Sequence, residues 1–380
     1  MRKVAIVGLG LSKFRKKAKE SSFKEIMFEV TKEAHQDAHL TSEDIESVVT
    51  TGEDLTEGRA IADEFVPDQI GGALKPNNRI CADSIYGLFS GFMQITSSLF
   101  DLVLVVGYDK MSEVVNSAKL TSFALDPVFV QPLGLNPLCI AALEMNRYMS
   151  LYNVTKEQIA LVPVKNKRSA LSNPKACYGE EIEVKDVLDS EVVCSPLNSL
   201  DISSLCDGAA AVILASEDKA KKITNQPIWI EGIGWSSDSS SAFWSNLELG
   251  NAGYIEKASK RAYRMAGIKD PLKEIDLAEV DDRFSYKELQ HIEALGLCKR
   301  GEGAKFIEEG KFPLNPSGGL LGMGDPHSAA GLVRVVESAL QLQERAGRHQ
   351  ISKPGRRAVA LGWSDLPSRS GGVVILRRGR

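Results

Sequence analysis

The chain has 380 residues, 43% of them hydrophobic and 25% charged, which is the composition of an ordinary soluble protein with one large domain or two fused ones. Its net charge of −4, with basic residues scattered along the chain, argues against nucleic acid or an anionic membrane as a partner. The six cysteines stand far apart without a Cys-x-x-Cys pair, so the sequence indicates no zinc site and no redox dithiol, and we expect reduced thiols in the cytoplasm. No apolar run is long enough to span a membrane.

The first half of the sequence alternates between apolar strands and helices. Hydrophobic periodicity separates the two, because an apolar face recurs about every 3.6 residues in a helix, whereas a buried strand is a short continuous apolar run. Residues from about 112 to 153 show neither pattern and are expected to form an irregular loop subdomain. The other predicted elements are strand 4–7, helix 22–38, strand 45–51, helix 82–98, strand 102–107, helix 155–172 and strand 207–215.

The second half starts the same succession again. Both halves open on a strand that ends in glycines, at 4–10 and 227–234, and each later has a helix that leads into a buried strand. This correspondence predicts a duplicated, layered α/β fold with an N-terminal half, 1–220, and a C-terminal half, 221–380. The predicted elements of the second half are strand 227–234, helix 254–266, strand 277–280, helix 285–295, helix 327–344 and strands 357–363 and 371–376.

Cys81 is the most informative single residue of the sequence. It directly precedes the predicted helix 82–98, which leads into the buried strand 102–107. The N-terminus of a helix carries about half a positive charge, which stabilises a thiolate and makes a nucleophile of an ordinary cysteine. The alternative is a buried structural cysteine, which is the commoner role of an isolated thiol.

Six short motifs stand in order along nearly the whole chain. They are Cys81-Ala-Asp-Ser, Val105–Met111, Ser204–Ala211, Glu279-Val-Asp-Asp-Arg-Phe, Asn315–Leu320 and Gly324-Asp-Pro-His-Ser-Ala-Ala-Gly. The first, fourth and sixth resemble the segments Cys-Ala-Ser-Gly, Glu-Val-His-Asp-Cys-Phe and Gly-His-Pro-x-Gly-Ala-Thr-Gly of the thiolase superfamily. Within that superfamily the chain is most similar to the archaeal and sterol-carrier-protein-type thiolases.

The resemblance implies a thiolase fold, with duplicated halves in a five-layered αβαβα arrangement, and a homodimer. It implies a coenzyme A thioester as substrate or ligand, with no bound cofactor and no metal. In the family a cysteine thiolate, which Cys81 matches, accepts an acyl group from coenzyme A. Archaeal relatives commonly work with a small zinc-ribbon/OB-fold protein, so the resemblance implies such a partner as well.

Two histidine positions of the family's active site hold aspartates here, Asp281 and Asp325. In the family, one histidine activates the cysteine and both support an oxyanion hole, in which one donor is worth about 3–4 kcal/mol. The carboxylates could share a proton and act as an acid/base pair, or Arg283 could pair with one of them and fill the pocket with ions. The segment 363–371 also lacks the family's second cysteine and an obvious Gly-Gly turn.

Further candidate residues lie in the Gly-rich loop of the second half. Gly318, Gly319 and Gly324 permit close approach of a ligand to the backbone, and Ser328 is assigned with them to an oxyanion and ligand loop. His327, two residues beyond the second aspartate, is an auxiliary candidate, with the alternative that it only supports the site or faces solvent.

Three functions remain open from the sequence. The first is an acyl-CoA acyltransferase of lipid metabolism, similar to acetyl-CoA acetyltransferase, that works through an acyl-Cys81 intermediate. The second, motivated by the loss of both histidines, is a non-catalytic acyl-CoA-binding or scaffold subunit of a thiolase complex. The third is a thiolase-fold aldolase that acts on a β-hydroxyacyl-CoA, which the absence of tyrosine at positions 281 and 325 weakens.

Overall fold

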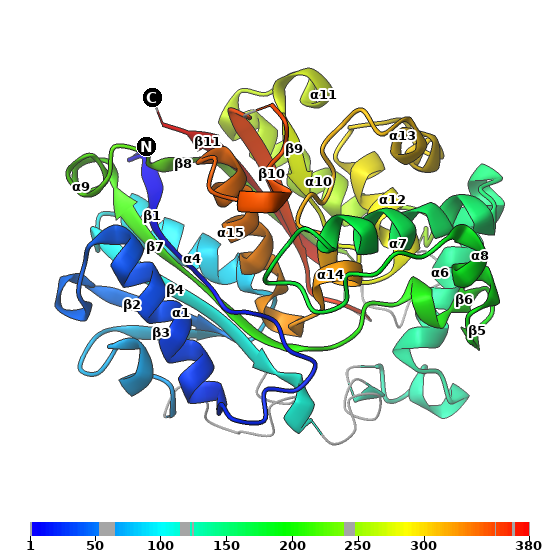
Figure 1. Ribbon diagram of the computed structural model, residues 1–380, viewed down its shortest axis with the longest axis horizontal. Coiled ribbons are helices and arrows are strands. Elements are labelled where there is room, and N and C mark those ends of the chain that lie inside the picture. The colour runs from blue at the N-terminus through cyan, green and yellow to red at the C-terminus, as the bar shows by residue number, and fades with distance from the viewer. Residues whose placement is uncertain are drawn as a thin grey trace.

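A single mixed sheet forms the centre of the molecule (Figure 1). The computed structural model describes residues 2–52, 65–114, 122–123, 125–238, 248–353, 355–366 and 369–379. Within these ranges the sheet has nine strands. Their order across the sheet is β3 (Asn77–Ile80), β2 (Ser47–Thr51), β4 (Leu102–Lys110), β7 (Asp207–Ser216), β1 (Val4–Leu11), β8 (Ile228–Ser237), β11 (Ser370–Arg378), β10 (Arg357–Trp363) and β9 (Leu277–Glu279).

The sheet repeats one four-strand pattern, which confirms the predicted duplication. In the N-terminal half β1, β7, β4 and β2 are neighbours in this order, and the first two pairs are antiparallel while the third is parallel. In the C-terminal half β8, β11, β10 and β9 repeat the order and the directions. The halves join where β1 pairs with β8 through Ala5–Trp229 and Ile6–Ile228. The chain crosses between them through α9 (Glu217–Ile223), and the boundary after residue 220 stays a prediction.

Helices cover the outer faces of the sheet and fill the space between its halves. α1 (Phe23–Ala38) packs on β1, β7 and β4, and α10 (Gly253–Ala266) packs on β8 and β11. α4 (Ser84–Thr96) and α15 (Ala330–Leu342) contact each other and strands of both halves, so they form the middle layer (Figure 1). The result is the predicted αβαβα arrangement. Because helices lie on both faces, β1, β4 and β7 are buried along almost their whole length.

The expectation of an irregular stretch over 112–153 is wrong for its second part. Residues Pro137–Tyr152 form a helix, α6, which begins where the Asn136 side chain accepts a hydrogen bond from the backbone N–H of Cys139 at 2.9 Å. Asn before Pro is a standard helix start, since proline suits the first helical position. The helix was missed because its polar residues are few, so its apolar face has little contrast with the rest.

The remaining elements lie around this layered core. Within the described ranges, no helix is both long and apolar enough to cross a membrane. The remaining helices and strands are α7 (Lys156–Ala170), α8 (Val184–Asp189), the pair β5 (Val192–Cys194) and β6 (Leu197–Asn198), α11 (Pro271–Glu274), α12 (Ser285–Ala294), α13 (Gly303–Glu309) and α14 (Gly319–Met323).

Candidate active site

Cys81 lies just ahead of the middle-layer helix α4, as predicted, but it does not cap that helix. α4 begins at Ser84, and its N-cap is Asp83, whose carboxylate accepts hydrogen bonds from the N–H groups of Ile85 at 2.9 Å and Gly331 at 3.0 Å. Cys81 itself is exposed to solvent. The negative charge favoured by the helix start is therefore supplied by an aspartate, and the thiol stands outside the first turn.

Asp83 is buried, and this has an electrostatic cost. Burial raises the pKa of the Asp83 carboxyl to about 6, although the nearby Arg334 acts to lower it. The corresponding family segment, Cys-Ala-Ser-Gly, has serine at this position. The buried acid therefore distinguishes this chain from that segment.

The start of α4 meets the Gly324–Gly331 motif, as expected for parts of one site. The hydroxyl of Ser84 accepts a hydrogen bond from the N–H of Leu332 at 2.7 Å. The N–H of Ser328 donates to a carboxylate oxygen of Asp109, in β4, at 2.6 Å. The Cys81–Ser84 segment and the end of β4 are thus brought together with the Gly324–Gly331 motif, which is more than two hundred residues away from both.

Asp325 is held in a bidentate ion pair with Arg283. Arg283 donates from Nε to Oδ2 at 2.7 Å and from Nη2 to Oδ1 at 3.2 Å, and Ser203 Oγ donates to Oδ2 at 2.8 Å. Both side chains are almost completely buried. Burial opposes ionisation of Asp325, but the charge and hydrogen bonds of Arg283 outweigh it and lower the pKa to about 2.

Asp281 has an arginine of its own. The guanidinium of Arg334, which projects from α15, pairs with Asp281 Oδ2, and it also donates to the carbonyl of Leu361 at 2.9 Å. The other carboxylate oxygen of Asp281 accepts the backbone N–H of Arg283 at 3.0 Å. The sequence did not single out Arg334. The available signal was a lone basic residue within the apolar stretch of the predicted helix 327–344.

These contacts favour the ion-pair interpretation of the aspartates over a shared proton. Each carboxylate faces an arginine, Arg334 at Asp281 and Arg283 at Asp325, and no described hydrogen bond joins the two carboxylates. Of the two partners considered for Arg283, the side chain pairs with Asp325, and only its backbone N–H reaches Asp281. The arrangement is an ion-pair network at both histidine positions of the family.

His327 brings an imidazole to the same place. It is 7% exposed and has φ of 44°, and its ring lies between two acids, with Nδ1 at 3.8 Å from Asp109 and Nε2 at 3.8 Å from Asp365. The hydroxyl of Ser328 lies 3.3 Å from Nδ1. The histidine is therefore buried within the site and does not face solvent.

The glycines of the predicted ligand loop make close contacts with the protein itself. An ideal Cβ at Gly318 would lie 2.5 Å from Cβ of Ala170, and one at Gly324 would lie 2.8 Å from the sulfur of Cys206. At Gly319 the nearest atom would be a carboxylate oxygen of Asp282, 2.2 Å away. These contacts explain why glycine is needed, and a role in ligand binding stays a prediction.

Gly319→Ala is expected to lower the free energy of unfolding by about 2–4 kcal/mol. Alanine is strained at this positive φ, and its Cβ would displace the buried carboxyl group of Asp282. Gly319 has φ of 55°, and Asp282 hydrogen-bonds the N–H of Leu320 at 2.6 Å, so it cannot move away freely. Gly347→Ala is the matched control, because Gly347 has φ of 65° but nothing within 4 Å of the added Cβ. Equal losses in urea denaturation of the two variants would contradict the role of Asp282.

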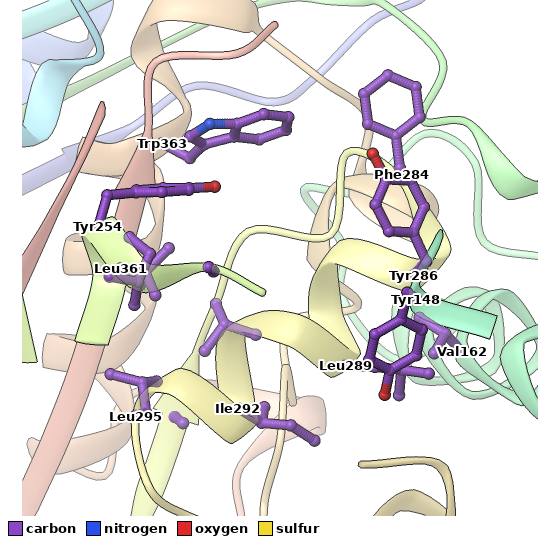
Figure 2. Close-up of a cluster of buried hydrophobic side chains, with 14 of the residues drawn as sticks. Tyr148, Val162, Tyr254, Phe284, Tyr286, Leu289, Ile292, Leu295, Leu361 and Trp363 are labelled. Carbon is purple, nitrogen blue, oxygen red and sulfur yellow. The ribbon is translucent and has the colours of Figure 1, made fainter. Parts of the chain in front are cut away.

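A second group of buried ions and aromatic rings lies around Trp363, the last residue of β10. Lys287 Nζ lies 2.5 Å from Glu144 and 4.6 Å from the ring centre of Trp363, and burial lowers the pKa of Lys287. Arg369 donates to the other oxygen of Glu144 at 3.1 Å. Figure 2 shows the buried hydrophobic cluster beside these ions, with Trp363 and Tyr254 on one side and Phe284 and Tyr286, at the start of α12, on the other.

The segment after β10 is where the family has a second cysteine or a Gly-Gly turn. Here Trp363 is completely buried, with its ring in edge contact with that of Phe284 at 6.2 Å between centres. Within the described residues, no group of three or more His, Cys, Asp or Glu side chains could hold a metal ion.

Two family models together match most of the chain: "Thiolase, N-terminal domain" over residues 4–218 and "Thiolase C-terminal domain-like" over residues 239–378. An acetyl-CoA acetyltransferase of Methanothermobacter thermautotrophicus is 31% identical over 364 residues, which cover 92% of this chain and 94% of that relative. Sterol carrier protein 2 of Bos taurus is 30% identical over 382 residues, which cover 94% of this chain and 69% of that relative.

A solved structure named "Ltp2-ChsH2(DUF35) aldolase" has the same fold, with a TM-score of 0.83 at 24% sequence identity. The match covers 100% of this chain and 98% of that chain. Both halves of the sequence, the duplicated sheet and the order of the motifs therefore lead to one conclusion: the chain belongs to the thiolase family.

Proposed function

We propose that this chain is a non-catalytic, acyl-CoA-binding subunit of a thiolase complex. The observation that carries the proposal is the pair of ion pairs, Asp281–Arg334 and Asp325–Arg283, at the two positions where the family has histidine. Histidine-assisted acyl transfer needs a base for the thiol and donors for an oxyanion. In these pairs the oxygens of both carboxylates are occupied by arginine N–H groups, so neither side chain replaces the base or the donor that a histidine would supply.

The proposed ligand is a coenzyme A thioester, and the proposed partner is a small zinc-ribbon/OB-fold protein. The acyl-CoA ligand is supported by the similarity to an acetyl-CoA acetyltransferase over nearly the full length of both chains. The partner is supported by the solved aldolase, which is named together with a DUF35 protein. A homodimer and a cytoplasmic location belong to the same proposal.

Acyl transfer through Cys81 is the second candidate, and a specific observation favours it. Cys81 is exposed and lies two residues before Asp83, the N-cap of α4, so a thioester could reach its sulfur. In this scheme Cys81 would attack the thioester carbonyl, and coenzyme A would leave as the thiol. His327 places an imidazole in the site, and Asp109 and Asp365 lie on either side of it.

Intact-protein mass spectrometry after incubation with acetyl-CoA and with longer acyl-CoAs separates these functions. We expect no acyl adduct on the parent protein, together with a higher melting temperature when the same acyl-CoA is present. Cys81→Ala should show the same rise, because binding does not depend on the thiol. An adduct on the parent protein that is lost in Cys81→Ala would overturn the proposal in favour of acyl transfer. Absence of both adduct and melting shift would contradict acyl-CoA binding.

A further inference from the structure

Two cysteines that are 55 residues apart in the sequence lie side by side in the fold. Cys139 stands in the first turn of α6 and Cys194 at the end of β5, and their sulfur atoms are 3.5 Å apart. A disulfide bond is about 2.05 Å long, so a small approach of the two side chains would join them. Both thiols are partly exposed, which lets a small oxidant reach them. This pair could not be predicted from the sequence, because the two cysteines lack the Cys-x-x-Cys spacing.

The surroundings give the two sulfurs different roles. The thiol of Cys194 donates its hydrogen to the sulfur of Cys139. Cys139 belongs to the N-terminal turn of a helix of 16 residues, where negative charge on a sulfur is favoured. Burial, and then the contact with Cys139, raise the pKa of the Cys194 thiol. Cys139 is therefore the sulfur better placed to react first, and Cys194 the one that follows.

The other cysteines with a sulfur neighbour are less open. Cys177 and Cys206 both lie against Gly324, since an ideal Cβ there would be 3.0 and 2.8 Å from their sulfurs. Cys206, however, is completely buried directly before β7. Among the described cysteines, Cys139 and Cys194 thus form a pair in which the two sulfurs are close together and both are accessible to a small molecule.

We propose that Cys139 and Cys194 form a reversible disulfide when the protein meets a hydroperoxide. The Cys139 thiolate attacks one oxygen of the peroxide, the O–O bond breaks, and Cys139 becomes a sulfenic acid while the alkoxide or hydroxide leaves and takes up a proton. Cys194 then loses its proton and attacks the Cys139 sulfur, the S–O bond breaks, and the hydroxide is protonated to water. Two thiols are oxidised, and the peroxide is reduced to an alcohol or water and one further water.

The bond would fasten the β5–β6 pair to α6. α6 also carries Glu144, which is ion-paired with Lys287 of α12 and with Arg369. Oxidation would therefore add a covalent link to a helix that is already ion-paired with the C-terminal half. The proposal is independent of whether the chain binds acyl-CoA or transfers acyl groups.

The experiment uses the full chain, first reduced and freed of reductant, then treated with hydrogen peroxide and blocked with N-ethylmaleimide. Chymotrypsin cuts after leucine and so can separate Cys194 from Cys206, because Leu197, Leu200 and Leu205 lie between them. We expect a cross-linked peptide pair that contains Cys139 and Cys194, a loss of about 2 Da in the intact protein before blocking, and reversal by a dithiol. A higher melting temperature of the oxidised protein is expected too, since the cross-link restricts the unfolded chain.

Cys139→Ser and Cys194→Ser should each abolish the cross-link, whereas Cys81→Ser should retain it. The melting temperatures of all three variants under reducing conditions show whether they are folded. Recovery of both Cys139 and Cys194 as maleimide adducts after peroxide treatment, at a dose that oxidises Cys81, would overturn the proposal. So would oxidation of Cys139 to the sulfinic acid without a cross-link.

Discussion

Replacing Arg334 with methionine is expected to lower the free energy of unfolding by about 3–5 kcal/mol, which is the cost of leaving a buried charge without its counter-ion. Arg334 and Asp281 are both almost completely buried, and the variant would leave Asp281 with the single N–H of Arg283 as a described partner. The carbonyl of Leu361 would also lose a donor. Denaturation with urea, followed by fluorescence and by circular dichroism, measures the loss.

A second substitution tests whether the charge itself is responsible. Asp281→Asn in the Arg334→Met background removes the orphaned carboxylate, so the double variant should regain at least half of the loss, because replacing both ions of a buried pair is often close to neutral. Lys260→Met breaks the exposed pair with Glu256 and should cost less than about 1 kcal/mol. An Arg334→Met protein as stable as the parent would contradict a stabilising ion pair between Arg334 and Asp281.

Most of the fold could be predicted because its helices and strands have clear local patterns of apolar residues. The strands of the N-terminal half are short apolar runs, and α1 has apolar residues on one face with a Ser22 cap, so periodicity alone placed them. The duplication could also be predicted, since it repeats the same order of elements. α6 could not, because its hydrophobic contrast is weak and only its Asn136-Pro137 start marks it.

The candidate site could be predicted only in part, because its chemistry depends on contacts between distant segments. The motifs identified the aspartates, but nothing in the sequence indicates that Asp325 takes Arg283 while Asp281 takes an arginine from α15, 53 residues further on. The same holds for Cys81. Its place before α4 was predicted, yet the cap is Asp83, which is fixed by the N–H of Gly331 from the other half of the chain.

Stability is expected to fall by about 2–3 kcal/mol between pH 6.5 and 8.5, because this chain buries acids that hold their protons only when folded. Burial, and then the nearby Glu337, raise the pKa of Glu279 to about 8, against 4.5 for an ordinary glutamate. Burial and the neighbouring Glu288 raise the pKa of Asp282 as well. At these two groups the folded protein therefore binds more protons than the unfolded chain, and the stability that Glu279 contributes is full below about pH 4.5 and is lost as pH rises through 8.

The fall in stability is expected only above pH 6.5, because below this pH another buried group, His291, makes the folded state more stable as pH rises. Burial lowers the pKa of His291 to about 3, so this histidine makes the folded state more stable as pH rises to 6.5 and has no effect beyond. Above 6.5 the acids dominate. The ion-paired Asp325, with a pKa of about 2, adds a stability that is lost only in strong acid, and it leaves this window unchanged.

Glu279→Gln isolates the main contributor. Glutamine can keep both contacts of this side chain, accepting the Ser317 N–H and donating to its hydroxyl, so it should fold and show a much smaller fall in unfolding free energy from pH 6.5 to 8.5. Glu308→Gln, at an exposed position of α13, should keep the parent's slope. Urea denaturation at four pH values across the window gives all three slopes. A parent protein of constant stability, or a Glu279→Gln variant with the parent's slope, would mean that Glu279 is not protonated in the fold, and the carboxylate would then need a cation that the described contacts do not provide.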